Sequence, residues 1–383
     1  MINVVDLFSG AGGLTLGFYK KAKYNHLVKR DSFHFLFANE INHFAAAAFR
    51  YNFPDIPLLE CDIADITPEL LALKKINFAN TDIVIGGPPC QSYSTVGKRQ
   101  YDQRARMYQE YIRLLGFIKP KMFIFENVTG LLTMENNEQK PVIEDIKEMF
   151  RDIKHDHSLG YLIHQTVLNA KDYGVPQNRE RVFIVGTRQD TSLEWDFPKK
   201  TYGEGLLPYL TVSDAISDFP SLENNETKTQ YSSLPANDYQ KLLREGSSEL
   251  NDHVCGNYGR KMTRIMESLS QGESKGNINE KVASGLLDKD LFLTSGYKNT
   301  YGRLWWDRPS TTITNSLGTP SALRCIHPFD NRALTTREGA RLQSFPDVFH
   351  FYGNKYEKNS QIGNAVPPIL AMALADSVIK SFE

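Results

Sequence analysis

The chain has 383 residues, of which 41% are hydrophobic and 23% charged, and its formal net charge is −1. This composition is typical of a globular protein and excludes extensive disorder and fibrous architecture. The near-zero charge excludes binding to nucleic acid through overall attraction, so phosphate contacts would have to come from local clusters of Lys and Arg. At a typical ~150 residues per domain, the length predicts two domains.

The N-terminal segment carries no basic leader, and no apolar run looks long enough to cross a bilayer, so we expect a soluble, cytoplasmic protein. The cysteines are far apart and form no Cys-x-x-Cys pair, which argues against a disulfide framework and a zinc site. They are Cys61, Cys90, Cys255 and Cys325. His155 and His157 have no accompanying ligand residues, so we expect no metal.

Short β-rich apolar runs alternate with helical patterns over residues 1–190, which is typical of βαβ units on a parallel sheet. The runs predict strands at 2–7, 35–40, 83–86, 122–126 and 182–186. Apolar residues at helical spacing predict helices at 42–52, 107–118 and 142–153. The first 190 residues are therefore expected to form a doubly wound α/β domain.

The character of the sequence changes after residue 190. Segments 199–207 and 220–237 are polar, rich in Asn, Ser, Thr, Gly and Pro, and have no helical period. Helical patterns return at 333–345 and 368–382. We therefore expect a second, smaller and irregular domain over 191–325, and a segment 326–383 that returns to complete the first domain.

A glycine-rich turn at 10–13 joins the first strand to a helix, and the missing Cβ atoms allow a ligand to approach the backbone. Thr15 stands where the dinucleotide fingerprint has its third glycine, which disfavours NAD. Glu40 and Asp62 stand where later parallel strands should end, so their carboxylates can accept hydrogen bonds from ribose hydroxyls and an adenine amino group. These features favour an adenosyl cofactor. For either acid, helix capping or surface charge is the alternative.

The strand at 83–86 runs into Gly87-Pro88-Pro89-Cys90, which places a thiol on a loop stiffened by two prolines at the functional edge of the sheet. An isolated cysteine is more often a small buried hydrophobe. The prolines before Cys90 and the polar residues after it make a helix or strand interior improbable. We therefore interpret Cys90 as a nucleophile.

Two segments carry a family resemblance, residues 6–13 with the sequence DLFSGAGG and residues 87–94 with the sequence GPPCQSYS. Together they resemble the DNA cytosine-5 methyltransferases of bacterial restriction-modification systems. The likeness continues in order through 125–128 (FENV), 177–181 (QNRER), 337–347 (REGARLQSFPD) and 361–368 (QIGNAVPP), and it fails only across about 190–300.

The resemblance implies a Rossmann-like methyltransferase sheet, dependent on S-adenosylmethionine, with a smaller target-recognition domain over 191–325. It also implies covalent chemistry, in which the Cys90 thiolate adds to C6 of cytosine so that C5 can take the methyl group. Glu126 would contact N3 and the exocyclic amine of the base. Arg179 and Arg181 would hold O2 and order the site, with support of Glu126 as the alternative for Arg181.

The resemblance also implies a cofactor site, with S-adenosylhomocysteine as the product and no metal. Phe8 would stack on adenine, the backbone of the glycine-rich turn would meet the methionine part, and Glu40 would bind the ribose. The implied cofactor residues are Phe8, Gly10, Ala11, Gly12, Gly13, Leu14, Glu40, Ile41, Asp62, Ile63, Pro89, Asn364 and Ala365.

A thiol cannot reach a base inside a duplex, so the target cytosine must rotate out of double-stranded DNA. By resemblance this involves the loop 97–107, in which Ala105-Arg106 departs from the family pattern and leaves the individual contacts open. For the major groove the candidate is 297–314, although its tryptophans could equally belong to a core. The predicted DNA-binding residues are Lys98, Arg99, Arg104, Arg303 and Trp305.

Three other functions were weighed. A tRNA cytosine-5 methyltransferase would share most of these motifs, but the region 190–320 is long enough for a DNA sequence reader. A cysteine hydrolase would need a His base, and none of the nine His residues lies in a recognisable partner motif. A catalytically silent homologue is disfavoured because the four implied catalytic residues are present. The resemblance further suggests a bacterial cytoplasmic enzyme that acts as a monomer beside a cognate restriction endonuclease.

Overall fold

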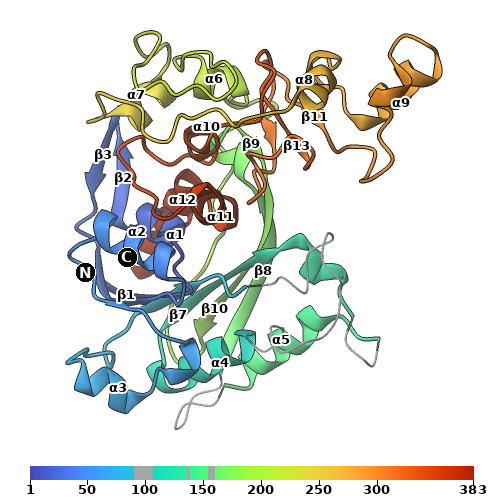
Figure 1. Cartoon of the computed structure of the whole chain (residues 1–383). Coiled ribbons are helices and arrows are strands. Elements are labelled where there is room, and N and C mark those ends of the chain that lie inside the picture. Colours follow the sequence, from blue (N-terminus) through green and yellow to red (C-terminus); the bar gives the residue numbers. More distant parts are fainter. Residues whose placement is uncertain (90–106, 136–138, 154–159) are drawn as a thin grey trace.

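The computed structural model describes residues 1–89, 107–135, 139–153 and 160–383. Its centre is a seven-stranded sheet with the order β5-β4-β1-β6-β7-β10-β8, visible along the lower half of Figure 1. The strands are β1 (Ile2–Leu7), β4 (Phe33–Asn39), β5 (Leu58–Leu59), β6 (Ile83–Gly86), β7 (Met122–Val128), β8 (Tyr161–Asn169) and β10 (Glu180–Arg188).

Neighbouring strands from β5 to β7 are parallel, and β10 runs antiparallel to both β7 and β8. The strand order reverses between β1 and β6, because the chain builds outward from β1 to β4 and β5 before it crosses back. In an open sheet of this kind, ligands bind at the carboxyl ends of the strands beside that reversal. The topology therefore points to the ends of β1 and β6.

Alternate residues of each strand enter two separate cores. In β7, Met122 and Ile124 join one core, and Phe123 and Phe125 join the other. The first core is covered by α1 (Gly13–Tyr19), α2 (His43–Asn52), α10 (Thr336–Leu342) and α12 (Pro368–Phe382), and the second by α3 (Pro68–Leu73), α4 (Met107–Ile118) and α5 (Val142–Arg151). This confirms the doubly wound α/β fold.

The C-terminal helix α12 packs directly on α1, so the two ends of the chain share one core. The segment Lys355–Phe382, which comprises α11 (Lys355–Asn364) and α12, is the one described stretch long and apolar enough to cross a membrane. A stretch of this length and composition was not expected from the sequence. Because 67% of its apolar window is buried inside the fold, core packing accounts for its composition.

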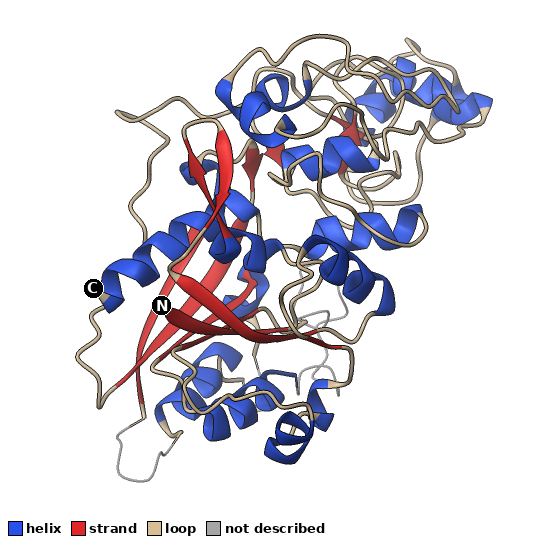
Figure 2. Ribbon diagram, turned by 90° about the vertical axis from the view of Figure 1, so that its left-hand side faces the viewer, coloured by secondary structure: helices blue, strands red, loops and turns tan. Residues whose placement is uncertain are grey.

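Between β10 and α10 the chain forms short elements joined by long loops, which Figure 2 shows gathered above the central sheet. A small core of its own includes Ile265, Met266 and Ile278. The helices are α6 (Val212–Ile216), α7 (Asp238–Arg244), α8 (Arg260–Glu267) and α9 (Lys275–Ala283), and the strands are β11 (Gly302–Arg303), β12 (Ser310–Thr311) and β13 (Arg324–Ile326). The domain boundaries at 190 and 325 stay predictions.

Two further pairings complete the described structure. The strands β2 (Lys20–Lys23) and β3 (His26–Lys29) form an antiparallel hairpin, and β9 (Gln177–Asn178) pairs in parallel with β12. The pairing of β9 with β12 joins the irregular region to the strand that leads into β10. Short 3-10 helices lie at Ile63–Asp65, Thr129–Thr133, Ala170–Tyr173 and Lys289–Leu291.

Candidate active site

The glycine-rich turn connects β1 to α1 at the predicted edge of the sheet. Phe8, Gly10 and Gly12 have φ angles of 58°, 58° and 99°, all in the left-handed region. The Ser9 amide donates to Asn39 O at 2.9 Å, which fixes the turn to the end of β4. The turn therefore curls back over the strand ends, with open space beside the Gly10 backbone and the Phe53 ring packed on Gly12.

Glu40 lies against this turn, as the sequence predicted for a residue at a strand end. Its Oε2 accepts from the Gly10 amide at 2.8 Å, and its Oε1 accepts from the Asn42 amide at 2.6 Å. Burial raises the pKa of the Glu40 carboxyl, and these backbone amides act in the opposite direction. The pair of bonds fixes a carboxylate at the mouth of the turn.

Asp6 lies at the end of β1 beneath the turn, and the sequence analysis assigned it no role. It is fully buried, Thr15 donates its hydroxyl to Asp6 Oδ2, and Oδ1 has no hydrogen-bond partner among the described residues. Burial, with a contribution from Glu40, raises the pKa of Asp6 to about 7. Thr15, which broke the dinucleotide fingerprint, therefore serves to anchor this acid.

The other predicted cofactor acid behaves differently. Asp62 is exposed and accepts from the Ala64 amide at 2.9 Å, so it caps a 3-10 helix, which was the alternative raised from the sequence. The neighbouring Ile63 is buried, whereas Ile41 is 62% exposed.

The C-terminal segment meets the glycine-rich turn directly. A Cβ atom on Gly13 would lie 2.6 Å from Val366 O and 2.9 Å from Ala365 Cβ, so only glycine permits this approach. Asn364 is exposed and donates its side-chain amide to Ser360 Oγ at 3.3 Å. The fold thus brings predicted cofactor residues from both ends of the chain to one place.

The predicted nucleophile loop leaves the sheet at the end of β6, between the ends of β1 and β7. Its described part ends at Pro89, which is exposed, and Cys90 lies outside the described residues together with Lys98, Arg99 and Arg104. Asn127 donates its side-chain amide to Pro88 O at 3.3 Å. This tether was missed from the sequence, although Asn127 lies within the FENV motif.

Glu126 and Arg181 form an ion pair beside this loop, with 3.1 Å between Glu126 Oε1 and Arg181 Nε. Glu126 is 8% exposed, and burial raises the pKa of its carboxyl despite the opposing charges of Arg181 and Arg179. A Cβ atom on Gly87 would lie 2.6 Å from Glu126 Oε2, so the loop backbone crosses directly over the carboxylate. This ion pair fits the support of Glu126 by Arg181, and a contact of Arg181 with O2 stays a prediction.

The contacts of Arg179 fit the ordering part of its predicted role, and its contact with O2 stays a prediction. It is 1% exposed, and its guanidinium donates to Ile313 O, Gly363 O and Ala365 O at 2.9, 2.8 and 2.9 Å. These three carbonyl oxygens compensate for the burial of the Arg179 charge. Arg179 therefore binds the C-terminal segment to the β9–β10 turn.

Two glutamines that the sequence analysis left without a role reinforce this connection. Gln177 accepts from the Ile313 amide at 2.9 Å and donates to Leu342 O at 3.2 Å. Gln343 donates to Ala365 O at 2.7 Å and also bonds to Gln177. Both lie in the motifs quoted above, and their near-complete burial is the property that a motif alone does not reveal.

The prediction that Arg303 binds DNA is contradicted by its burial. It is 3% exposed, and Nη1 donates to His327 O at 2.7 Å and to Asp330 O at 2.9 Å. Nη2 donates to Met266 O at 2.6 Å and to Asn331 Oδ1 at 2.7 Å. Arg303 is therefore a structural residue. Trp305 is half-buried, which fits both a DNA contact and a place in a core.

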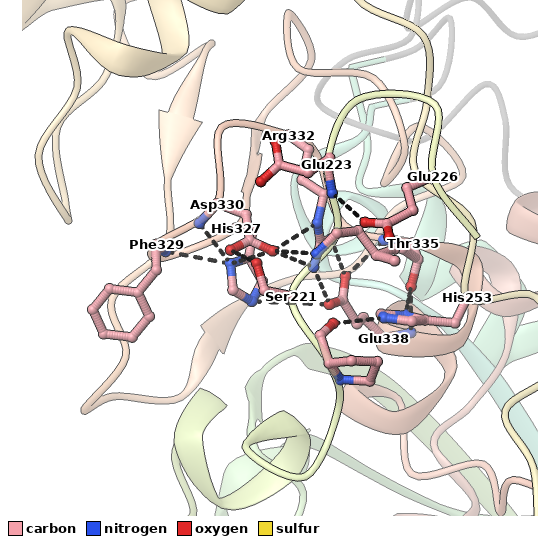
Figure 3. A network of polar contacts seen from close by, with 12 residues as sticks. Ser221, Glu223, Glu226, His253, His327, Phe329, Asp330, Arg332, Thr335 and Glu338 are labelled. Atoms are coloured by element: carbon pink, nitrogen blue, oxygen red, sulfur yellow. Dashed lines mark hydrogen bonds and ion pairs between the residues drawn. The ribbon is translucent and has the colours of Figure 1, made fainter. Parts of the chain in front are cut away.

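The loop that Arg303 holds also belongs to a buried polar network, shown in Figure 3. Arg332 donates to both carboxylate oxygens of Glu338 at 2.7 Å, and Asp330 accepts from Ser221 Oγ at 2.7 Å. Burial lowers the pKa of His327 to about 4, and its Nδ1 accepts from the Asp330 amide at 3.0 Å. A lowered pKa favours neutral His327, and its Nδ1 already accepts a hydrogen bond, as expected of a structural residue and not of the general base of a hydrolase.

In the described part of the chain there is no group of three His, Cys, Asp or Glu side chains that could hold a metal ion. The groups available for chemistry in the described part of the site are the carboxylates, arginines and backbone groups at the ends of β1, β4, β6 and β7.

This chain is similar to known proteins over nearly its whole length. The family described as C-5 cytosine-specific DNA methylase matches residues 2–380. Type II methyltransferase M.DdeI of Desulfomicrobium norvegicum is 34% identical over 397 residues, covering 100% of this chain and 89% of the relative. Type II methyltransferase M1.HphI of Haemophilus parahaemolyticus is 35% identical over 383 residues, covering 99% of this chain and 87% of the relative.

Solved structures support the fold alone, because their identities are low. A structure described as a DNA modification methyltransferase encoded within an E. coli prophage has 24% identity and a TM-score of 0.72, and covers 100% of this chain and 99% of that chain. DNMT2 of Spodoptera frugiperda has 15% identity and a TM-score of 0.59, with 100% of both chains covered. The family match and the relatives above 30% identity carry more: this chain belongs to the C-5 cytosine-specific DNA methylase family.

Proposed function

We propose that this DNA cytosine-5 methyltransferase methylates cytosine in double-stranded DNA as the modification enzyme of a type II restriction-modification system, with Cys90 as its nucleophile. The observation that carries the proposal is the Glu126–Arg181 pair at 3.1 Å, held under the Gly87–Pro89 segment that leads directly into Cys90. A thiol, a carboxyl of raised pKa and a guanidinium at one sheet edge are the groups that covalent addition to a pyrimidine requires.

The residues at the glycine-rich turn fit S-adenosylmethionine, which supplies the methyl group as a sulfonium. The turn leaves open space beside the Gly10 backbone, and the fixed carboxylate of Glu40 can accept hydrogen bonds from ribose hydroxyls. Phe8 would stack on adenine, and Ala365 packs on Gly13 where the methionine part would lie. The remaining cofactor residues proposed are Ala11, Leu14, Ile41, Asp62, Ile63, Pro89 and Asn364.

In the proposed reaction the Cys90 thiolate forms a bond to C6 of the extruded cytosine. Glu126 donates its proton to N3, which neutralises the charge that the addition pushes into the ring. The ring electrons would then make C5 nucleophilic, and C5 would take the methyl group with S-adenosylhomocysteine as the leaving group. Return of the N3 proton to Glu126, loss of the C5 proton to a base and expulsion of the thiolate would restore the aromatic ring. Arg181 positions Glu126, and Arg179 holds the surrounding backbone together.

The substrate proposal rests on relatives named as type II methyltransferases. We infer a cytoplasmic bacterial enzyme that acts as a monomer, with a cognate endonuclease cutting the same sequence. Lys98, Arg99 and Arg104 are proposed to contact DNA phosphates. A tRNA substrate is the less supported alternative, and methyl incorporation into duplex DNA but not into tRNA, measured in parallel, distinguishes the two.

The covalent mechanism is tested with duplex DNA that contains 5-fluorocytosine. The fluorine cannot leave as a proton does, so the thiolate stays bound and the enzyme forms an adduct in the presence of the methyl donor. The expected result is a stable protein–DNA complex with the native enzyme and none with Cys90→Ala, while Cys90→Ala still binds the donor in calorimetry. An adduct that persists with Cys90→Ala would refute the assignment of the nucleophile.

A further inference from the structure

In the irregular region, the indole ring of Trp305 contacts two arginine side chains. The guanidinium carbon of Arg324 lies 4.3 Å from the ring centroid of Trp305, and that of Arg308 lies 5.4 Å from it. We call these three residues the Trp305 cluster. A Cβ atom on Gly272 would clash with the indole Nε1, so the edge of the ring is seated on a glycine. The ring is a fixed platform for two cations.

The positive charges of the cluster are poorly neutralised. Arg324 Nη1 donates to Arg303 O at 2.6 Å and to Glu273 O at 3.0 Å, and among the described residues Arg324 has no carboxylate partner. Burial alone lowers the pKa of Arg324. Arg308 is exposed, and its printed partner is the equally exposed Asp307 at 3.8 Å. Two guanidinium groups on one indole ring suit an anionic ligand.

Two other buried arginines of this part of the fold are paired with carboxylates. Arg332 is paired with Glu338 at 2.7 Å, and Arg341 is paired with Asp347 and with Asp218. Arg303 also forms no ion pair among the described residues, but it is 3% exposed and its guanidinium donates to four acceptors, whereas Arg324 is half-buried and donates to two. A half-buried guanidinium without a carboxylate partner suits an anionic ligand that supplies the charge.

The cluster is attached to the catalytic edge through β12. Thr311 Oγ1 donates to Arg324 O at 3.2 Å, and Thr311 pairs in register with Asn178 of β9. Two residues further on, Ile313 O accepts from Arg179, which precedes Arg181 by two positions. A substrate held at the cluster would therefore have a defined position relative to the Glu126–Arg181 pair.

We propose that the Trp305 cluster binds a backbone phosphate of the DNA substrate, with Arg308 and Arg324 as its ligands. The inference rests on the proposed function for the identity of the anion. Phosphate is favoured over a base edge because two arginine charges on one ring match a full negative charge, whereas base edges in the grooves are neutral. The proposal replaces Arg303, the residue predicted from the sequence, with two arginines that are less buried.

The test compares Arg308→Gln and Arg324→Gln with Arg264→Gln. Arg264 is a matched control, since it lies in the same region but already pairs with Asp288 and with Asp290, the latter at 3.0 Å. Binding of one duplex is measured at several salt concentrations. For each cluster variant the slope of log affinity against log salt concentration should fall by about 0.9, the value for one phosphate contact. Arg264→Gln should keep the native slope, and all variants should keep the native methylated sequence.

Native slopes in both cluster variants would overturn the inference, and so would a changed methylated sequence with an unchanged slope, which would mean base reading. If Arg324→Gln lowers the melting temperature, the exposed Arg308→Gln decides the question alone. Failure of the native enzyme to methylate a duplex that it binds would instead contradict the proposed function, while the slopes would still test the phosphate contact.

Discussion

Glu126 and Arg181 lie diagonally across the antiparallel strands β7 and β10, where Glu126 pairs with Phe183 and Arg181 pairs with Val128. Their charged groups meet at 3.1 Å, although neither residue directly opposes the other in the ladder. The burial of Glu126 raises the pKa of its carboxyl, and Arg181 limits that rise. The pair therefore sets how readily a proton is held at the position where N3 of a cytosine would lie.

Replacing Arg181 by Gln should move the pH dependence of the reaction. Without the guanidinium the pKa of Glu126 rises further, so its protonated form persists to higher pH, and the alkaline limb of the kcat profile should shift upward. The value of kcat itself should fall because Glu126 loses its support. Arg181→Lys, which keeps the charge, should show a smaller shift. If the alkaline limb of the kcat profile stays in place or moves to lower pH, Glu126 does not act as the proton donor.

The contact between Gly87 and Glu126 gives a second prediction. In Gly87→Ala the new methyl group would lie 2.6 Å from Glu126 Oε2, so the carboxylate or the loop must move. We expect kcat to fall by at least tenfold, with little change in the melting temperature. The control is Gly116→Ala in α4, where a Cβ atom meets nothing within 4 Å and should stabilise the helix by about 0.5–1 kcal/mol. Equal activities of the two variants would show that the approach is unimportant.

Much of the fold followed from the sequence because its periodicity is strong. Strands β1 and β6 and helices α4 and α12 have the predicted bounds. Strand β8 was missed, since it is an edge strand that exposes Leu162 and Val167 and has the polar residues His164, Gln165 and Thr166 at its centre. The hairpin β2–β3 was missed because it is rich in lysine, which is depleted in strands.

The site was predictable where a motif fixes chemistry, and unpredictable where burial decides the role. Glu40 against the glycine-rich turn follows from strand order alone. Arg303 and Arg308 look alike in the sequence, but one lies beneath a loop and donates to backbone carbonyls while the other is exposed. No pattern of residue types distinguishes them, because the acceptors of Arg303 include backbone oxygens brought there from residues 266, 327 and 330.

Loss of Arg179 should affect stability more than chemistry. Arg179→Met leaves Ile313 O and Gly363 O without this donor, while Ala365 O keeps Gln343, so we expect the free energy of unfolding to drop by about 3 kcal/mol. Because Gly363 and Ala365 adjoin the glycine-rich turn, donor affinity should fall as well. Urea unfolding and calorimetry measure the two effects. Arg50→Gln, which breaks an exposed pair with Glu60, is the control and should lose less than about 1 kcal/mol.

Replacing Arg303 should separate structure from DNA contact. Arg303→Gln removes several of the hydrogen bonds that hold the loop at 327–331, so the melting temperature should fall. The salt dependence of DNA binding per folded molecule should match that of the native enzyme, because no phosphate contact is lost. A reduced slope with an unchanged melting temperature would restore the sequence-based assignment.

Asp6 should make the stability of the protein depend on pH. Its pKa in the folded chain is about 7, against 3.8 for the ordinary carboxyl. A group whose pKa is raised by folding adds stability in full below its unfolded value and loses that contribution as pH rises toward the folded value. Native stability should therefore decline between about pH 4 and pH 7, by roughly 1.4 kcal/mol per pH unit from this group. In Asp6→Asn the contribution is absent. Urea unfolding at pH 5, 6, 7 and 8 should therefore show that the free energy of unfolding of the variant, relative to that of the native protein, increases up to pH 7 and then stays constant. Parallel curves for the two proteins would mean that Asp6 is ionised in the fold at all of these pH values.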